Sequence, residues 1–314
     1  MRLFNGKKVA EKILKNLKQK IRKENLKPKL AVILVGEDEA SKIYIRLKKE
    51  AAGRVGVGFE LYRYDNSIEE EEIIAKIKEL NERADITGII IQLPLPEGLN
   101  RDKIISAIDV LKDVDGFHTE NRRLFEQGKP NFEPVLPNAI LTAIKEAYHQ
   151  PSCRTCFGIS LPEILKQVEN KFSASKQDDK KSKILQNKKA VALVNSDIFG
   201  QTLKLFLEME EINFKYIIRN ACLIKGAEKE LKQADIVISV CGCPGLITGE
   251  TIKKGAIVID GGIFRSKDGK VVGDVERASV EGVASFLTPV PGGLGPLVIA
   301  LLLNNVFIAS KMKK

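Results

Sequence analysis

The strongest constraint on the fold is a repeated alternation of strand-like apolar runs with amphipathic helical patterns. The predicted strands lie at 29–35, 58–64, 88–92, 190–194, 214–218, 235–240 and 256–259. The predicted helices lie at 7–24, 40–55, 68–82, 138–148, 200–211, 227–233 and 296–311, and Asn66 or Ser67 is the expected N-cap of the third. Such alternation is typical of parallel sheets covered by helices. The sequence therefore predicts an α/β protein with two domains, each built on a parallel sheet.

Composition favours a water-soluble, intracellular protein. Of the 314 residues, 44% are hydrophobic and 29% are charged, which is ordinary for a globular protein with a sizeable core. No apolar run approaches the length of a membrane span, and the N-terminus lacks the apolar stretch of a secretory signal. Five cysteines in a chain of this length do not resemble a disulfide framework. We expect a reducing cytoplasm as its location.

The net charge of +10 has two interpretations. It could attract a polyanion such as nucleic acid. It could equally reflect solvated helices rich in lysine, such as 7–23. The second interpretation is favoured because no nucleic-acid motif accompanies the charge and because aromatic residues, the stacking platforms for single strands, are only 6% of the chain.

Four short segments carry chemical information. The first runs from Tyr44 to Lys48, two residues that share one helix face one turn apart. The others are 92–96 (Gln-Leu-Pro-Leu-Pro), 112–118 (Lys-Asp-Val-Asp-Gly-Phe-His) and 288–296 (Thr-Pro-Val-Pro-Gly-Gly-Leu-Gly-Pro). Taken together and in this order, the four segments resemble those of the bifunctional methylenetetrahydrofolate dehydrogenase/methenyltetrahydrofolate cyclohydrolase family.

The resemblance implies roles for individual residues of the N-terminal domain. It makes Lys48 the catalytic lysine, Gln92 the glutamine that hydrogen-bonds it, and Tyr44 the aromatic residue that contacts folate. Asp115 would hold the pterin ring, and the turn Pro291-Gly292-Gly293 would line the substrate cleft.

Elementary chemistry agrees with these roles. Hydrolysis of methenyltetrahydrofolate needs water to attack the bridging carbon of a cationic amidinium. A lysine that is partly desolvated has a lowered pKa, so Lys48 could accept a proton from that water or orient it. Gln92 is neutral and can position the amine without raising its pKa. A carboxylate such as Asp115 can accept hydrogen bonds from the amino group and the ring N–H of a pterin.

The expected dinucleotide loop departs from the family pattern, which reads Gly-Arg-Ser-x-x-x-Gly-x-Pro. Here Val194, Asn195 and Thr202 replace the first Gly, the Arg and the Pro, whereas Ser196 and Gly200 are kept. We expect Val194 to crowd the pyrophosphate turn and the loss of the arginine to weaken binding of the 2′-phosphate of NADP.

Other residues of this half still favour a nucleotide site. Gly242 and Pro244 match a family loop that follows a later strand. Arg219 stands where an acidic ribose ligand would end the strand 214–218, and it could instead meet a 2′-phosphate or be an ordinary loop residue.

The expected domains are a catalytic folate-binding domain (1–138), a Rossmann-like NAD(P)-binding domain (139–288) with an insertion at about 150–187, and a C-terminal segment (289–314) that returns to the catalytic domain. Within the insertion, Cys153, Cys156 and the nearby His149 invite a zinc interpretation. No fourth ligand is evident, so no metal is expected. Cys241 and Cys243 are expected to pack as small apolar groups.

The favoured function is NADP-linked oxidation of methylenetetrahydrofolate followed by hydrolysis to formyltetrahydrofolate. NAD is the alternative cofactor, polyglutamylated folate a candidate substrate form, and a homodimer the expected assembly. Two other functions stay open. One is a cyclohydrolase whose dehydrogenase activity is weak or lost, and the other is a non-catalytic polyanion-binding protein on the same fold.

Overall fold

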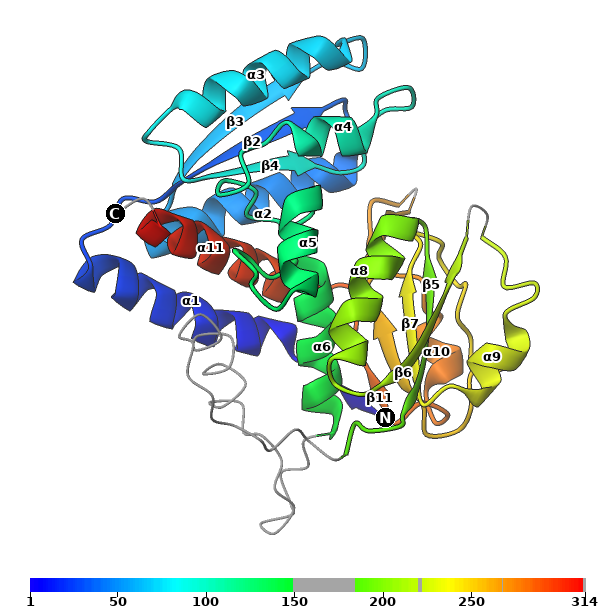
Figure 1. Cartoon of the computed structure of the whole chain (residues 1–314). Coiled ribbons are helices and arrows are strands. Elements are labelled where there is room, and N and C mark those ends of the chain that lie inside the picture. Colours follow the sequence, from blue (N-terminus) through cyan, green and yellow to red (C-terminus); the bar gives the residue numbers. More distant parts are fainter. Residues whose placement is uncertain (149–183, 220–221, 267, 313–314) are drawn as a thin grey trace. The chain divides into compact units, whose positions relative to one another are not determined.

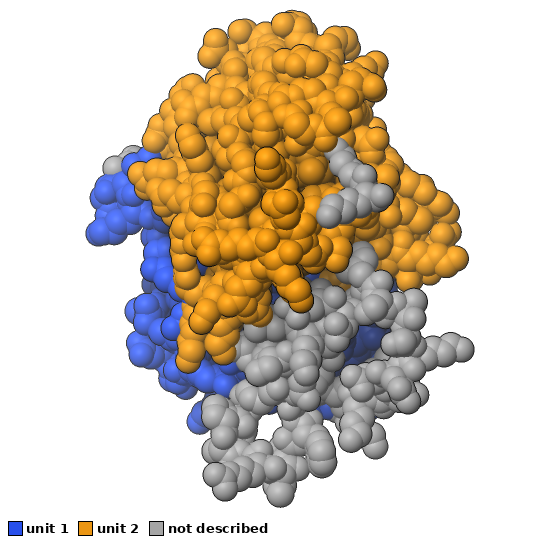
Figure 2. Space-filling view, turned by 90° about the vertical axis from the view of Figure 1, so that its left-hand side faces the viewer, with its two compact units in different colours: residues 1–7, 136–296 blue, residues 8–135, 297–314 orange. Residues whose placement is uncertain are grey.

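The structure is a computed structural model that describes residues 1–148, 184–219, 222–266 and 268–312. The chain forms two compact units (Figure 2), and each unit contains more than one stretch of sequence. Unit 1 contains Met1–Lys7 and Leu136–Pro296, and unit 2 contains Lys8–Val135 and Leu297–Lys314. The first and last segments of the chain therefore each join a unit formed mainly by other residues.

Unit 2 is built on a three-stranded parallel sheet with the order β3-β2-β4 (Figure 1). Its strands are β2 (Lys29–Val35), β3 (Gly58–Tyr64) and β4 (Gly88–Gln92). Its helices are α1 (Gly6–Lys23), α2 (Glu39–Val55), α3 (Glu70–Glu82), α4 (Arg101–Ser106), α5 (Thr119–Glu126) and most of α11 (Leu294–Met312). These strands match the predicted ranges, and the expected fold class is confirmed for this unit.

The core of unit 2 follows from the alternation of side chains along the strands. Ala31, Ile33 and Val35 of β2 share one face of the sheet, as do Ile89 and Ile91 of β4. This face packs in one apolar cluster against residues of α3, α4 and the adjoining segments, namely Ile73, Ile77, Leu80, Ile86, Ile104, Ile105 and Ile108. The sheet is thus fixed in the middle of the unit, and the carboxyl ends of its strands meet at one edge.

The start of α3 differs from the expectation, whereas its end at Glu82 is as predicted. The helix begins at Glu70, and its N-cap, Glu69, makes no side-chain cap hydrogen bond, so the predicted caps Asn66 and Ser67 are wrong. At the other end, the buried amine of Lys112 donates to the carbonyls of Leu80, Asn81 and Arg83. A cation at a helix C-terminus satisfies carbonyls that have no partner within the helix.

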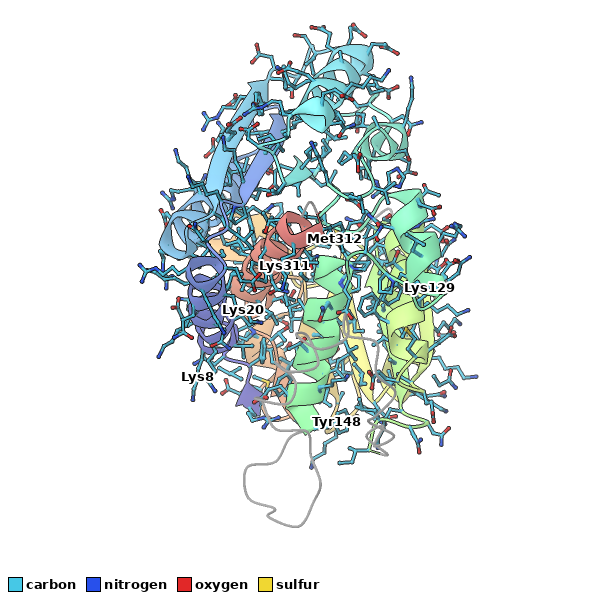
Figure 3. The ribbon with its side chains drawn as sticks, turned by 60° about the vertical axis from the view of Figure 1, so that its left-hand side comes forward. Lys8, Lys20, Lys129, Tyr148, Lys311 and Met312 are labelled. Atoms are coloured by element: carbon cyan, nitrogen blue, oxygen red, sulfur yellow. A yellow bond between two sulfur atoms is a disulfide. The ribbon has the colours of Figure 1, made fainter. Side chains whose placement is uncertain are left out.

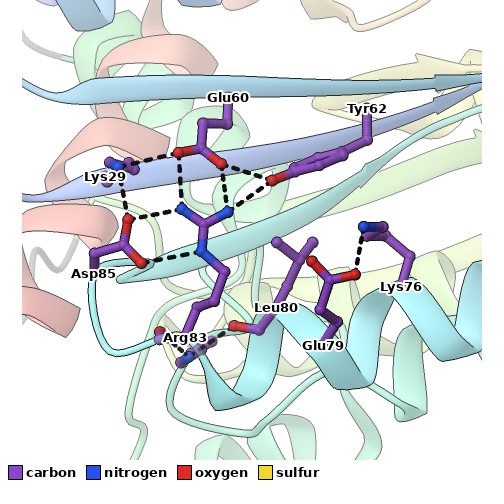
Figure 4. A network of polar contacts seen from close by, with 9 residues as sticks. Lys29, Glu60, Tyr62, Lys76, Glu79, Leu80, Arg83 and Asp85 are labelled. Atoms are coloured by element: carbon purple, nitrogen blue, oxygen red, sulfur yellow. Dashed lines mark hydrogen bonds and ion pairs between the residues drawn. The ribbon is translucent and has the colours of Figure 1, made fainter.

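A network of charges ties together the amino-terminal part of the same sheet (Figure 4). Arg83 donates to Glu60 and Asp85, and Lys29 donates to the same two carboxylates. These contacts hold the pKa of Glu60 down at about 2. Lys29 opens β2, so the network lies away from the carboxyl end of that strand, and its partly exposed pairs have a structural role.

Unit 1 contains a six-stranded parallel sheet with the order β1-β11-β8-β7-β5-β6 (Figure 1). Its strands are β1 (Arg2–Leu3), β5 (Lys189–Val194), β6 (Asn213–Ile218), β7 (Ile236–Val240), β8 (Ile257–Asp260) and β11 (Phe286–Leu287). A separate antiparallel pair comprises β9 (Phe264–Arg265) and β10 (Val271–Val272). The helices of unit 1 are α6 (Val135–Tyr148), α8 (Asp197–Glu208), α9 (Glu228–Gln233) and α10 (Arg277–Val280). Unit 1 contains α6 from Leu136 onward.

The strand order of unit 1 contains a topological switch point. From β5 the chain continues to β6 on one side of it and then places β7 on the other side. Open parallel sheets bind ligands outside the carboxyl ends of their strands at such a point. The loops that follow β5, β6 and β7 therefore surround the expected ligand crevice of this unit.

The exposed face of α1 carries much of the positive charge. Its apolar residues Val9, Ile13, Leu17 and Ile21 are buried, and lysines, including Lys8 and Lys20 in Figure 3, are the most frequent residues on the rest of its surface. A lysine-rich, solvated helix is the second of the two interpretations of the net charge.

Among the described residues, α11 is the one helix long and apolar enough to cross a membrane. This differs from the expectation that no apolar run reaches that length. Of the most apolar 18-residue stretch of α11, 67% is buried inside the protein, as in the core helix of a globular protein.

One cysteine of unit 1 corrects an expectation. Cys222, in the loop after β6, forms a disulfide with Cys243, in the loop after β7. The expectation that Cys243 packs as a small apolar group is therefore wrong. Cys241 is a free thiol, and burial raises its pKa to about 11.

We predict that Cys222→Ser lowers the free energy of unfolding of the oxidised protein by about 3 kcal/mol, because the bond closes a chain segment with a sequence separation of 21. Urea unfolding without reductant measures the change. Cys241→Ser removes a thiol from the same loop and leaves the disulfide in place, so it is the control. Equal stability of native and Cys222→Ser protein would contradict the pairing.

Candidate active site

Lys48 is a buried lysine of unit 2. It lies on α2, which begins after Asp38, an N-cap whose carboxylate accepts a hydrogen bond from Ser41 N at 2.7 Å. Only 8% of Lys48 is exposed, and burial lowers the pKa of its amine, although the negative charge of Asp115 opposes the change. A lysine in such surroundings can accept a proton at a pH closer to neutral than an exposed lysine can.

Gln92 holds this amine. It is the last residue of β4, in register with Leu34 of β2, so it stands at the carboxyl edge of the sheet. Lys48 Nζ donates to Gln92 Oε1 at 2.8 Å, and Gln92 Nε2 donates to the carbonyl of Leu93 at 2.8 Å. The second bond orients the amide, so that its oxygen faces the lysine.

Asp115 is the charged neighbour of Lys48. Burial raises the pKa of Asp115 to about 6, with Lys48 acting to lower it and Asp113 to raise it. The structure thus brings together a lysine that loses its proton more easily and a carboxylate that gains one more easily than usual. Such opposed shifts are typical of functional sites.

Tyr44 lies one helical turn before Lys48 and is partly buried. Burial raises its pKa to about 12, so the phenol is neutral at physiological pH. Tyr44 is therefore suited to ring contacts and hydrogen bonding, and not to proton abstraction.

Two buried residues that we had not selected support the Asp115 loop. The carboxylate of Asp113 accepts hydrogen bonds from His118 N at 2.8 Å and from Asn121 Nδ2 at 2.9 Å. Asn305 of α11 donates to the carbonyls of Val114 and Glu133. The sequence carries no local signal for Asn305, because the groups that it contacts are more than 170 residues away.

The Pro291-Gly292-Gly293 turn belongs to unit 1. Gly292 has a φ of 105°, and Gly293 N donates to the carbonyl of Pro289 at 2.7 Å.

The loop after β5 is shaped differently from the expectation. Val194 is the last residue of β5, paired with Val240 and Ile218, and its side chain is completely buried. It therefore packs inside unit 1 and does not crowd the turn. Asn195 is exposed, and Ser196 is the N-cap of α8, where its hydroxyl accepts a hydrogen bond from Phe199 N at 3.4 Å.

Gly200 allows close packing between α8 and β6. A side chain at this position would collide with the ring of Tyr216, whose hydroxyl donates to Asp197 at 2.7 Å. The third glycine of a dinucleotide fingerprint has this helix–strand packing function.

Arg219, Gly242 and Pro244 lie in the loops after β6 and β7, beside the switch point. Arg219 Nη2 donates to the carbonyl of Ile224 at a long 3.5 Å, and its buried Nε has no hydrogen-bond partner among the described residues. A guanidinium with a free buried donor is suited to an anionic ligand.

The described ranges contain no group of His, Cys, Asp and Glu that could hold a metal ion. His149, Cys153 and Cys156 lie outside those ranges.

Comparison with known proteins now identifies the chain. Residues 4–115 match the model of the tetrahydrofolate dehydrogenase/cyclohydrolase catalytic domain, and residues 178–314 match that of its NAD(P)-binding domain. The chain belongs to this family. It is therefore an enzyme of one-carbon folate metabolism, and nothing favours the non-catalytic alternative.

Similar proteins support this membership over the full length. The bifunctional protein FolD of Nautilia profundicola is 36% identical, over 99% of this chain and 98% of the relative. The crystal structure of the bifunctional enzyme FolD from Campylobacter jejuni covers 100% of both chains at 31% identity, with a TM-score of 0.79. The Trypanosoma brucei enzyme, solved in complex with NADP and an inhibitor, has 25% identity and a TM-score of 0.80 and covers 99% of this chain and 97% of its own.

Family membership and the position of Val194 bear on the open alternative of a weak dehydrogenase. One reason for that alternative was the expected crowding of the pyrophosphate turn by Val194. Because the Val194 side chain is buried, this reason no longer applies. The replacement of the family's arginine by Asn195 remains as a difference in charge.

Proposed function

We propose that this family member oxidises methylenetetrahydrofolate to methenyltetrahydrofolate with NADP and then hydrolyses the product to formyltetrahydrofolate. The observation that carries the proposal is the hydrogen bond from the buried Lys48 amine to Gln92, beside Asp115, a carboxylate with a pKa of about 6. In this proposal unit 2 binds folate and performs the hydrolysis, and unit 1 binds the nucleotide.

In the hydrolysis, Lys48 has the role of general base. Its lowered pKa makes the neutral amine accessible, and this amine takes a proton from water as the oxygen attacks the bridging carbon of the amidinium. When the C–N bond then breaks, the ammonium returns the proton to the leaving nitrogen, and the hydroxyl on the former bridging carbon releases its proton to water as the formyl C=O bond forms. Gln92 keeps the amine in place through a neutral acceptor, which avoids the rise in pKa that a carboxylate would cause.

Folate binding is assigned to the surrounding residues. The Asp115 carboxylate accepts hydrogen bonds from the pterin amino group and ring N–H, and the neutral ring of Tyr44 contacts the substrate. The Pro291-Gly292-Gly293 turn of unit 1 is assigned as a further substrate-binding element on the strength of the family resemblance.

NADP is assigned to the switch point of unit 1. When bound, it accepts the hydride of the oxidation. Ser196 and Gly200 shape the turn into α8, Gly242 and Pro244 form the loop after β7, and Asn195 borders the turn. The buried Nε of Arg219, which has no hydrogen-bond partner within the described ranges, supports a role for this residue toward the 2′-phosphate, which distinguishes NADP from NAD.

We further propose a homodimer in the cytoplasm that accepts folates with a polyglutamate tail. Family resemblance supports the dimer, and the net charge of +10 supports an anionic tail. The Cys222–Cys243 disulfide is uncommon for a reducing compartment, so thiol trapping in cells tests the location.

Two assays on the purified protein test the function. Reduction of NADP with methylenetetrahydrofolate reports the dehydrogenase, and loss of methenyltetrahydrofolate absorbance reports the cyclohydrolase. We expect both activities, with NADP preferred over NAD. Hydrolysis without any nucleotide reduction would instead support the cyclohydrolase alternative.

We predict that folate binding weakens as the pH falls through about 6, because the pKa of Asp115 is raised to about 6 and only its ionised form accepts both pterin hydrogen bonds. The KM for folate should be flat above about pH 7 and rise about tenfold for each further pH unit below about 6. The dependence should disappear in Asp115→Asn. A native profile that stays flat down to about pH 4, where an ordinary aspartate titrates, would contradict the assignment.

A further inference from the structure

A buried carboxylate that the proposed reactions do not use lies beneath the loop after β7. Asp274 is completely buried, and its side chain accepts three hydrogen bonds. Its Oδ2 accepts from Ser239 Oγ at 2.7 Å and from Cys241 N at 2.8 Å, and its Oδ1 accepts from Cys243 N at 2.5 Å. The backbone on both sides of Gly242 is therefore fixed to one side chain.

A second buried carboxylate holds Asp274 in place. Asp260, at the end of β8, is 3% exposed and accepts from Asp274 N at 3.0 Å and from Val275 N at 3.1 Å. Asp260 also accepts from Gly262 N, at 3.0 Å. The loops after β7 and β8 are thus organised around two carboxylates at the carboxyl edge of the sheet, next to the switch point.

The surrounding chain leaves room for the Asp274 carboxylate. A methyl group built on Gly262 would collide with the carboxyl atoms of Asp274, and all three of the nearest atoms that it would meet belong to that group. The absence of a side chain at this position therefore allows the carboxylate to reach the loop.

These contacts require a side chain with two oxygen atoms that accept hydrogen bonds. The three groups that face Asp274 are all used as donors, and a carboxylate is a side chain that only accepts. An amide of the same shape would turn a donor toward one of these donors, which leaves a buried N–H without an acceptor. The loop is therefore sensitive to the replacement of one oxygen by nitrogen.

We propose that Asp274 is a positioning residue for the nucleotide: it fixes the Cys241–Cys243 backbone so that the Gly242–Pro244 loop forms one wall of the crevice. Asp274 acts through this backbone and does not itself touch the nucleotide. The inference rests on the proposed binding of NADP at the switch point, and it adds a residue that sets the affinity of that site.

Asp274→Asn tests the proposal in the full-length protein. Titration calorimetry measures the Kd for NADP, and the two assays measure KM for NADP and the cyclohydrolase rate. We expect the Kd and KM for NADP to rise about tenfold or more, since hydrogen bonds to a charged group are lost. Cyclohydrolysis uses no nucleotide and should stay within about twofold of the native rate, a separation that a general loss of structure would not produce.

Asp235→Asn is the matched control. Asp235 also accepts a hydrogen bond from a backbone N–H, that of Lys189 at 2.8 Å, but it precedes β7 and so lies at the opposite end of the strand. Its replacement should leave the Kd for NADP unchanged.

Gly262→Ala is the second variant, and it decides the matter if Asp274→Asn does not fold. It displaces the Asp274 carboxylate while keeping its charge, and we expect it to weaken NADP binding in the same direction. An unchanged Kd in the folded variants would overturn the positioning role, and so would a parallel loss of both activities. Failure of the native protein to bind NADP would overturn the proposed nucleotide site and, with it, this inference.

Discussion

Replacement of Lys48 by methionine should reduce the cyclohydrolase rate by about a thousandfold. The expectation follows from the proposed role of the amine as the general base, a role that typically contributes about 10²–10⁴ in rate. Methionine retains the aliphatic length of the buried stem, so the packing of α2 should be preserved, and Gln92 Oε1 loses its donor. The measurement is the rate of methenyltetrahydrofolate hydrolysis at neutral pH, with the Kd for NADP as a test of folding in unit 1.

Lys49→Met is the matched control for this variant. Lys49 is the next residue of the same helix, and its side chain is exposed. It should hydrolyse the substrate at the native rate, which separates the loss of one particular amine from the loss of any positive charge on α2. Hydrolysis by Lys48→Met at a rate near that of the control would show that the buried amine is not the base.

Replacement of Asp115 by asparagine should raise the Kd for folate about 10–100-fold. The pterin would lose a charged acceptor for its two donors, and the amide nitrogen would face one of those donors directly; hydrogen bonds to charged groups contribute about 1.5–3 kcal/mol. The substitution keeps the shape of the side chain, so the Asp113–Asn121 contact behind it should remain. Fluorescence or calorimetric titration with tetrahydrofolate measures the change.

Asp102→Asn provides the comparison for Asp115→Asn. Asp102 is an exposed carboxylate in the first turn of α4, paired with Arg101 at 3.2 Å. Its replacement alters the net charge by the same amount and should leave the folate Kd as it is. If Asp115→Asn binds folate as tightly as this control, then Asp115 does not contact the pterin.

The main strands could be predicted from the sequence alone, and the family resemblance implied the contact between Lys48 and Gln92 that the structure contains. Apolar or alternating stretches of five to seven residues between amphipathic patterns predict β2, β3 and β4, and the structure has them over the same ranges. This information is local, because side-chain alternation repeats within a few residues. The segment that contains Tyr44 and Lys48, together with Gln92 at a strand end, was sufficient to place these residues near one edge of a parallel sheet.

Only the tertiary structure decided what depends on contacts between distant segments. It buried the side chain of Val194 in the sheet, where the motif alone suggested a steric obstacle. It joined Cys222 to Cys243, and it placed Asp274 beneath a loop more than 30 residues earlier in the chain. Such contacts, like the pKa of Asp115, depend on which groups the fold brings together and on how deeply it buries them. Local periodicity in the sequence encodes neither the long-range contacts nor the burial.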